Sequence, residues 1–314
     1  MPHSLALHTP ARQAMPTTIS RRSLLLSAWA GSLLTGCAMN ADADHTGPDA
    51  PSAGPLPARP HVTCVFSSGG TRGFVHVGVI KALDEMGVVP DLIVGASIGA
   101  VVGVLRAGGL RGPALEALAL DLQPARLARV TVGNGEYLSG SAVADLVREQ
   151  LQKKGCAPRL EALPMMVVCV AQRLSDGAIA AFNRGDAGLA VQAACAVEGQ
   201  FTPVRINGQR HADADLRQPL PVRLARSLGA DRILAVDASA DETRAPAGTE
   251  RWRAGDLRKR ALTRPDALAA DLLLQPDIGY YTNISREYRE RCIAAGYRTT
   301  LAAAGRIKAL FAAG

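Results

Sequence analysis

The chain has 314 residues, of which 48% are hydrophobic and 20% charged, and this is enough apolar material for one sizeable core or two modest ones. The composition excludes a chain that is disordered throughout, and no run of about 20 apolar residues predicts a membrane-spanning helix. The formal net charge is +7, but the basic residues are scattered and only 4% of the residues are aromatic, so we expect a solvated surface and no nucleic-acid binding.

Residues 1–36 have the pattern of an export signal. Two adjacent arginines, Arg21 and Arg22, precede an apolar stretch that runs to Leu34 and is too short to span a bilayer as a mature helix. The pair fits a twin-arginine signal, and an ordinary secretory signal is satisfied equally well. A start at Met15 would give a leader of more typical length, so translation from Met15 is an alternative.

The signal is followed by a candidate lipid-attachment site. Residues 34–37, Leu-Thr-Gly-Cys, resemble the lipobox of bacterial lipoproteins, in which the signal is cut before the Cys and the Cys is acylated. The resemblance implies that Cys37 is the lipidated mature N-terminus and that Ala38 directs the protein to the outer membrane. We therefore expect a lipid-anchored protein of the bacterial cell envelope that faces the periplasm. Residues 37–60 are rich in Asp, Gly, Ala and Pro, which predicts a flexible linker.

The remaining cysteines do not predict a disulfide framework. Apart from Cys37 there are five, which is an odd number for an oxidising compartment. Cys64 and Cys169 lie in apolar strand-like runs and Cys195 lies in an Ala-rich run, where a buried thiol behaves as a small apolar group.

The folded domain is predicted to begin at residue 61 with a strand, a glycine-rich loop and a helix. Residues 61–66 favour a strand, and residues 67–73 (Ser-Ser-Gly-Gly-Thr-Arg-Gly) form the loop. Apolar residues at helical spacing follow over residues 74–86 and end at a glycine. A second strand over residues 92–94 leads into a second helix that ends near residue 107. This order predicts parallel βαβ pairing.

The second strand runs directly into Gly95-Ala96-Ser97-Ile98-Gly99, a G-x-S-x-G sequence between strand and helix that favours a nucleophile elbow. Such a turn strains the Ser backbone, and glycine at Gly95 and Gly99 removes Cβ atoms that would collide with neighbouring backbone. Ser97 would then stand at the carboxyl edge of the sheet, beside a helix N-terminus that favours developing negative charge. The same small residues also occur where they serve only close packing.

The earlier glycine-rich loop is the candidate oxyanion hole. Acyl transfer from a Ser nucleophile needs preorganised N–H donors. Gly69 and Gly70 allow close backbone approach, and Thr71 and Arg72 begin a helix whose free amides point at the site. A phosphate-binding loop is the competing interpretation, but the Lys-Ser/Thr ending of a P-loop is missing. Arg72 suits either a phospholipid head-group contact or a surface charge.

A general base is predicted near the end of a hairpin. Residues 201–215 are expected to form two strands that turn at Asn207-Gly208, with Asp213 at the end of the second. An Asp at that place could meet the Ser nucleophile and accept its proton. A helix over residues 222–228 and a strand over residues 233–236 follow.

A Ser-His-Asp triad would need a histidine, and the folded region offers His61, His76 and His211. His211 lies two positions before Asp213, on the same face of a regular strand, but the chain offers no acid to complete such a triad. We interpret His76 as a packing or partner-contact residue. Asp213 and Asp215 alone are weak evidence for a divalent metal, and we predict neither a metal nor a cofactor.

Taken together, these residues resemble the patatin-like phospholipase family, which uses a Ser/Asp dyad. The match runs from about Val62 to the end of the chain. The sequence words that carry it, besides the loop and the elbow, are Phe182-Asn183-Arg184-Gly185-Asp186, Ala193-Ala194-Cys195-Ala196-Val197, Asp213 before Pro219-Leu220-Pro221-Val222, Ala230-Asp231, and Gln275-Pro276-Asp277-Ile278-Gly279.

The resemblance implies a three-layer α/β/α fold with a mainly parallel central sheet over residues 61–314. It also implies Ser97 as the nucleophile, Asp213 as the base and an oxyanion hole formed by backbone amides of the glycine-rich loop. The implied substrate is a lipid or another acyl ester.

Three positions depart from the family pattern. Ser68 stands where the loop usually opens with Gly, Ala214-Asp215 follows the Asp where Gly-Gly or Gly-Ala is usual, and Glu198 stands where Pro is common. Asp215 would raise the pKa of Asp213 by like-charge repulsion. The departures either tune the site or mark a member whose activity has weakened. Residues 251–264 form a basic stretch with one Trp, which we expect to be a solvated loop or else a patch on anionic lipid head groups.

The sequence therefore predicts a membrane-tethered serine acyl hydrolase of phospholipase A, lysophospholipase or carboxylesterase type that acts through an acyl-enzyme on Ser97. The alternative is a non-catalytic or weakly active lipid-binding envelope lipoprotein that keeps the same fold.

Overall fold

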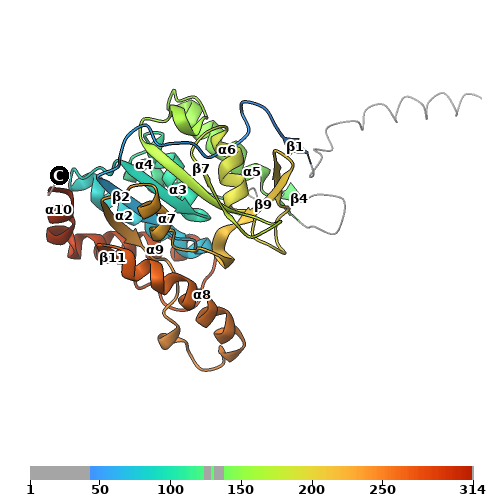
Figure 1. Cartoon of the computed structure of the whole chain (residues 1–314). Helices are drawn as coiled ribbons and strands as arrows, with labels where there is room; N and C mark the ends of the chain where they lie inside the picture. The colour runs from blue at the N-terminus through green and yellow to red at the C-terminus, as the bar shows by residue number, and fades with distance from the viewer. Residues whose placement is uncertain (1–42, 124–128, 131–137, 313–314) are drawn as a thin grey trace, which may run out of the picture. The chain divides into compact units, whose positions relative to one another are not determined.

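The computed structural model describes residues 43–123, 129–130 and 138–312, and all structural statements concern these residues (Figure 1). The expected export signal, the alternative start at Met15 and the candidate lipid-attachment site Cys37 lie outside the described residues. None of the described helices is both long and apolar enough to cross a membrane.

A mainly parallel sheet organises the fold. Its described strands are β1 (Asp44–His45), β2 (Val62–Phe66), β3 (Leu92–Ala96), β6 (Met166–Arg173), β7 (Ile179–Phe182), β8 (Val204–Ile206), β9 (Gln209–Asp213), β10 (Arg232–Val236) and β11 (Leu272–Leu274). The strands β6, β3, β2, β10 and β11 are parallel neighbours in that order. β7 and β9 pair with β6 antiparallel, β8 pairs with β9, and β1 adds to β8. A separate two-stranded ribbon joins β4 (Arg129–Val130) to β5 (Leu138–Ser139).

Helices cover both faces of this sheet. The described α-helices are α2 (Val75–Glu85), α3 (Ile98–Ala107), α4 (Gly112–Asp121), α5 (Ser141–Lys153), α6 (Ala187–Ala194), α7 (Val222–Ser227), α8 (Glu250–Ala269), α9 (Arg286–Ala302) and α10 (Ala304–Ala312). Short 3-10 helices lie at Gly70–Phe74, Leu160–Ala162, Ala214–Leu216 and Glu242–Arg244.

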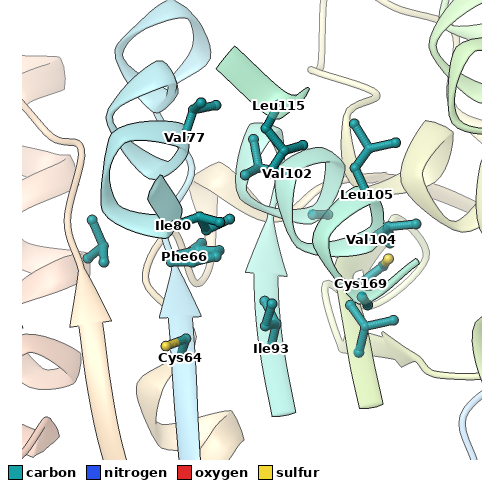
Figure 2. Packing of buried hydrophobic residues seen from close by; sticks show 14 of the residues in the cluster. Cys64, Phe66, Val77, Ile80, Ile93, Val102, Val104, Leu105, Leu115 and Cys169 are labelled. Carbon is teal, nitrogen blue, oxygen red and sulfur yellow. The ribbon is translucent and has the colours of Figure 1, made fainter. Parts of the chain in front are cut away.

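Successive side chains of each strand point to opposite faces of the sheet, and this divides the core into two layers. Cys64 and Phe66 of β2 belong to a large apolar cluster with α2, α3 and α9, whereas Val65 between them belongs to a second cluster with α7. Figure 2 shows the first cluster, where Ile80 of α2 and Val102 of α3 lie among the side chains that cover the strands. The result is the three-layer α/β/α fold that the sequence predicts.

The predicted βαβ unit and hairpin are confirmed. β2, α2, β3 and α3 follow one another, with β2 and β3 parallel. Gly87, just after α2, has a φ of 68° that suits glycine. β8 and β9 turn at Asn207-Gly208, where both residues have positive φ, as a two-residue hairpin turn requires.

Residues 44–60 differ from the linker that the composition predicts over residues 37–60. β1 pairs with β8, and the Ser52 N–H donates to the Arg184 carbonyl at 3.1 Å. The backbone N–H and carbonyl of Gly54 both bond to the Asn183 side chain, each at 2.8 Å. Composition misses this docking because backbone pairing to a sheet edge requires no apolar periodicity.

Residues 251–264 are helical, so the prediction of a loop there is wrong. They lie within α8, whose buried side chains are Thr263 and Asp266. The Asp266 carboxylate accepts a hydrogen bond from the Arg223 N–H at 2.7 Å and so ties α8 to the start of α7. The helix packs through polar groups, and for that reason its sequence lacks the apolar period on which a helix prediction depends.

Candidate active site

Ser97 occupies a strained turn between β3 and α3. Its backbone angles are φ 53° and ψ −126°, and Asn207 is the other non-glycine residue with positive φ in the described chain. A Cβ on Gly95 would lie 2.4 Å from the Gly99 carbonyl oxygen, and a Cβ on Gly99 would lie 2.4 Å from the Phe66 carbonyl oxygen. Both positions therefore require glycine, and the turn has the geometry that the sequence predicts for a nucleophile elbow.

Asp213 reaches the same edge of the sheet from the end of β9. It pairs with Ala171 of β6, and β6 pairs with β3, which leads into the Ser97 turn. Asp213 is only 3% exposed. Its Oδ1 accepts a hydrogen bond from the Asp215 N–H at 2.9 Å, whereas Oδ2 is buried without a well-formed hydrogen bond from any described residue. Oδ2 is therefore open to accept a proton.

The surroundings of Asp213 raise its pKa to about 7. Burial is the main cause because it disfavours the charged form, and the Ser97 hydroxyl acts in the opposite direction. The upward contribution expected from Asp215 is present and smaller than that of burial. A carboxyl group with a pKa near neutrality can both accept a proton and return it, which suits a general base.

The glycine-rich loop, residues 67–73, packs against the elbow. A Cβ on Gly73 would lie 2.1 Å from the Ile98 side chain, so the loop touches the residue that follows Ser97. The Ser68 N–H donates to the Pro219 carbonyl at 2.8 Å, which fixes the start of the loop. The amides that follow Ser68 therefore lie beside the elbow.

Three of the four candidate oxyanion donors are available. The N–H groups of Gly69, Gly70 and Thr71 have no backbone acceptor within the described chain, as is usual for the first amides of a helix. The Arg72 N–H, in contrast, donates to the Gly69 carbonyl at 3.0 Å. The prediction that Arg72 contributes a backbone donor is therefore wrong, because the 3-10 turn uses that amide. The Arg72 guanidinium donates to the Tyr280 carbonyl.

The two buried histidines have structural contacts. His76 is fully buried, its Nε2 lies 2.9 Å from the Ser67 carbonyl oxygen, and burial lowers its pKa to about 4. The ring is therefore neutral and donates through Nε2, and it also packs against Phe66. His211 places Nδ1 3.1 Å from the Gln209 carbonyl oxygen, in its own strand. These contacts confirm His76 as a packing residue, and neither ring has a described hydrogen bond to Ser97 or Asp213.

Cys195, just after α6, is a neighbour of Ser97 and Asp213 that the sequence does not place there. Its thiol interacts with the Ser97 hydroxyl and with Asp213, and burial raises its pKa well above the usual value. The thiol is therefore neutral and serves as a small, weakly polar wall of the site. All five described cysteines are free.

Two of the departures from the family pattern meet Lys259 of α8 in one polar cluster. Lys259 Nζ lies 2.7 Å from Asp215 Oδ1 and 3.2 Å from Ser68 Oγ, and Ser68 Oγ donates to the same Asp215 oxygen. Burial opposes ionisation of Asp215, but Lys259 and Ser68 outweigh it and lower the pKa of this carboxyl. The sequence does not point to Lys259 because it predicts a loop there. Recognition of residues 250–269 as a helix would have been needed to place Lys259 near the site.

The third departure, Glu198, accepts a hydrogen bond from the side chain of Gln172. Gln172 is buried in β6 and pairs with Ala212 of β9. Glu198 therefore ties the segment before the hairpin to the strand beside Asp213.

The described residues contain no group of three or more side chains placed to bind a metal ion. Asp215 is bonded to Lys259, and one Asp213 oxygen accepts a backbone N–H.

Two small cavities lie near the glycine-rich loop. One of about 40 Å³ is bordered by Gly69, Arg72 and Lys259, and it shares Ser239 and Ala240 with a second cavity of about 210 Å³. The border of the second mixes apolar and aromatic side chains, such as Ile278 and Tyr280, with charged ones, Asp241, Arg244 and Asp277. A further cavity of about 300 Å³ includes Met166 at the start of β6, at the opposite edge of the sheet from Ser97. The first two cavities are therefore the ones next to the site.

Comparison with known proteins places these features in a family. The family model described as patatin-like phospholipase matches residues 64–226, which include Ser97 and Asp213. An uncharacterized NTE family protein of Mycobacterium tuberculosis is 32% identical over 186 residues, which cover 58% of this chain and 50% of that protein. The chain thus spans about half the length of this relative.

Other relatives are longer. Lysophospholipase NTE1 of Coccidioides immitis is 29% identical over 201 residues, which cover 60% of this chain and 12% of that protein. Patatin-like phospholipase domain-containing protein 6 of Homo sapiens is 29% identical over 193 residues, which cover 58% of this chain and 14% of that protein. Among solved structures, VipD from Legionella pneumophila matches with a TM-score of 0.46 and 13% identity, over 87% of this chain and 72% of that chain.

Proposed function

Since the chain belongs to the patatin-like phospholipase family, we propose that it is a serine acyl hydrolase that cleaves lipid esters through a Ser97–Asp213 dyad. The observation that carries the proposal is the strained Ser97 beside a buried Asp213 whose Oδ2 has no well-formed hydrogen bond in the described chain. The names of the lysophospholipase and phospholipase-domain relatives support a lipid ester as the substrate.

The first half of the reaction acylates Ser97. Asp213 Oδ2 takes the hydroxyl proton as Ser97 Oγ attacks the ester carbonyl carbon. The carbonyl oxygen becomes an oxyanion, and the free N–H groups of Gly69, Gly70 and Thr71 donate to it. The tetrahedral species collapses, the C–O bond to the alcohol breaks, and Asp213 returns the proton to the leaving alcohol.

The second half releases the acid. Water attacks the acyl-enzyme carbonyl, and Asp213 accepts one of its protons. The second tetrahedral species collapses, Ser97 Oγ recovers the proton from Asp213, and the carboxylic acid leaves. The raised pKa of Asp213 fits this double use, because the group must accept and donate a proton in each half-reaction.

The test is Ser97-dependent labelling and turnover by the full chain purified in detergent. Wild-type protein is expected to react with a fluorophosphonate and to hydrolyse p-nitrophenyl butyrate, whereas Ser97→Ala loses both activities. Asp213→Asn is expected to lose turnover. Matched controls are Ser227→Ala at the end of α7 and Asp231→Asn just before β10, both at exposed hydrogen-bonded positions away from the dyad. Unchanged turnover in Asp213→Asn contradicts the dyad.

The competing function is a lipid-binding lipoprotein without turnover. It predicts no fluorophosphonate labelling together with retained binding of fluorescent phospholipid in both wild type and Ser97→Ala. Lipid profiling of membranes after exposure to wild type and to Ser97→Ala separates the two functions, because only an enzyme releases fatty acid in a Ser97-dependent way.

A lipid at Cys37 would tether the enzyme to the cell envelope, at the periplasmic face of the outer membrane. The support is the lipobox-like sequence at residues 34–37 and Ala38 after it. Metabolic labelling with an alkyne fatty acid is expected to mark wild type and Cys156→Ser but not Cys37→Ser. Membrane fractionation of Ala38→Asp tests the location, and a shift toward the inner membrane is the expected result.

The outer surface of α8 supports contact with an anionic membrane. This surface consists of Trp252, Arg253, Leu257, Arg264 and Leu268, all exposed, with Leu268 78% and Trp252 43% accessible. The last four lie at helical spacing on one face. Exposed apolar side chains among arginines are typical of a helix that lies on anionic head groups.

A further inference from the structure

The cluster of Ser68, Asp215 and Lys259 joins three separate parts of the chain at the active site. Ser68 opens the loop that carries the free amides, Asp215 lies two residues after the candidate base, and Lys259 lies on α8. Lys259 Nζ is 2.7 Å from Asp215 Oδ1 and 3.2 Å from Ser68 Oγ. One ammonium group therefore contacts the turn that follows Asp213 and the loop that carries the free amides.

The cluster also reaches Asp213 through the backbone. The Asp215 N–H donates to Asp213 Oδ1 at 2.9 Å, in the 3-10 turn that starts at Ala214. A shift of the Asp215 carboxylate therefore moves the donor that orients Asp213. The Ser68 hydroxyl also donates to Asp215, so the position of the glycine-rich loop depends on the same carboxylate.

We propose that Lys259 is a positioning residue of the active site, which holds the base-bearing turn and the oxyanion loop together through Asp215 and Ser68 and places a positive charge beside the dyad. This inference rests on the proposed hydrolase function. It assigns one shared purpose to the two departures at Ser68 and Asp215.

The charges around Asp213 come from several elements. Asp215 in the turn disfavours its charged form, Lys259 on α8 favours it, and the Ser97 hydroxyl also favours it. Cys195 after α6 faces the same carboxyl as a neutral thiol. Removal of Lys259 should therefore move the acidic limb of the pH–rate profile to higher pH. Removal of the Asp215 charge should move it to lower pH.

If Lys259 stabilised the fold through packing alone, the variants would behave differently. Loss of packing would lower activity in every variant of the cluster and leave the acidic limb in place. Opposite displacement of the limb in Lys259→Met and Asp215→Asn is thus the signature of the proposed electrostatic and positional coupling.

The experiment measures kcat and KM of the full chain in detergent for p-nitrophenyl butyrate from pH 5 to 9. For Lys259→Met we expect kcat to fall on the order of 10- to 100-fold with little change in KM. We expect its acidic limb to move to higher pH by about one unit. Asp215→Asn should shift the limb down, and Lys259→Arg should keep it at the wild-type position. Arg258→Met, which removes the neighbouring positive charge on the same helix, is the matched control and should leave kcat and the limb unchanged.

A second readout keeps the inference testable without turnover. The side-chain ¹³C shift of Asp213, assigned by comparison with Asp213→Asn, gives its titration midpoint in each variant. If wild type shows no Ser97-dependent turnover, the proposed function fails while this titration still tests Lys259. Midpoints that stay fixed, or that move in the same direction in Lys259→Met and Asp215→Asn, overturn the proposal. If Lys259→Met does not fold, as judged by thermal unfolding, Lys259→Gln replaces it in the comparison with Asp215→Asn.

Discussion

Replacement of Asp213, the proposed base, is expected to make the protein more stable while it abolishes turnover. The pKa of Asp213 rises from 3.8 to about 7 in the folded chain, mainly because the carboxyl is buried. The folded state therefore binds this proton more tightly than the unfolded state. The stabilisation that protonated Asp213 gives is complete below pH 3.8 and is lost as the pH rises through 7. At alkaline pH the folded chain carries the full cost of a buried carboxylate.

The size of the effect follows from the shift. A difference of roughly 3 units corresponds to about 4 kcal/mol at pH 8, and at pH 5, where folded Asp213 is already protonated, to about 2 kcal/mol. Asp213→Asn removes the titration and keeps an oxygen for the Asp215 N–H. We therefore expect it to raise the free energy of unfolding by up to these amounts, with a larger gain at pH 8.

Urea unfolding of wild type and Asp213→Asn at the two pH values provides the assay. Asp121→Asn, at an exposed position at the end of α4, is the control and should change the free energy of unfolding little at either pH. A gain that is equal at pH 5 and pH 8, or a loss at both, would refute the argument that the buried charge of Asp213 is costly.

Three further predictions concern turnover, the elbow and the membrane. The kcat/KM for a soluble ester is expected to fall about tenfold for each pH unit below pH 7, because Asp213 must be charged to accept the proton; a profile that is flat from pH 5 to 8 excludes this base. Gly99→Ala is expected to lower turnover and to destabilise the chain by about 1–3 kcal/mol, because the new Cβ would lie 2.4 Å from the Phe66 carbonyl oxygen. Gly255→Ala, in α8 with open space around it, is its control in the same urea assay. Arg253→Gln combined with Arg264→Gln is expected to weaken sedimentation with anionic vesicles by roughly 30-fold, since each arginine near such a surface contributes about 1 kcal/mol; unchanged binding removes α8 from the membrane contact.

The parts of the fold that sequence predicts are those in which local pattern and burial agree. β2, β3 and the elbow combine apolar runs with glycines that close backbone contact requires, so the βαβ unit and Ser97 are predictable. The hairpin carries Asn207-Gly208, the strongest short-range signal for such a turn, and this places Asp213 at a strand end.

The parts of the fold that the sequence does not predict are held by contacts that leave no periodic apolar pattern in the sequence. β1 docks through backbone pairing to a sheet edge, and α8 is anchored by Asp266, which caps α7, and by Lys259, which pairs with Asp215. Each of these partners is more than 40 residues distant in the chain, so no local window contains both members. The Arg72 amide is missed for a different reason, since its use in a 3-10 turn depends on where the helix begins.

The tertiary pairing also explains why the departures at Ser68 and Asp215 should be coupled. The Ser68 hydroxyl is buried and needs an acceptor, and Lys259 needs a counter-charge; Asp215 supplies both. Asp215→Ala leaves Lys259 and Ser68 without that partner, whereas the double variant Asp215→Ala with Lys259→Met removes both charges at once. We expect the double variant to lose less stability than the sum of the single losses, by about 1 kcal/mol, since both side chains are partly exposed and solvent screens the pair. Urea unfolding of the four proteins at pH 8 measures this difference. Losses that add within about 0.3 kcal/mol show that the two residues act independently, and the cluster is then not a unit.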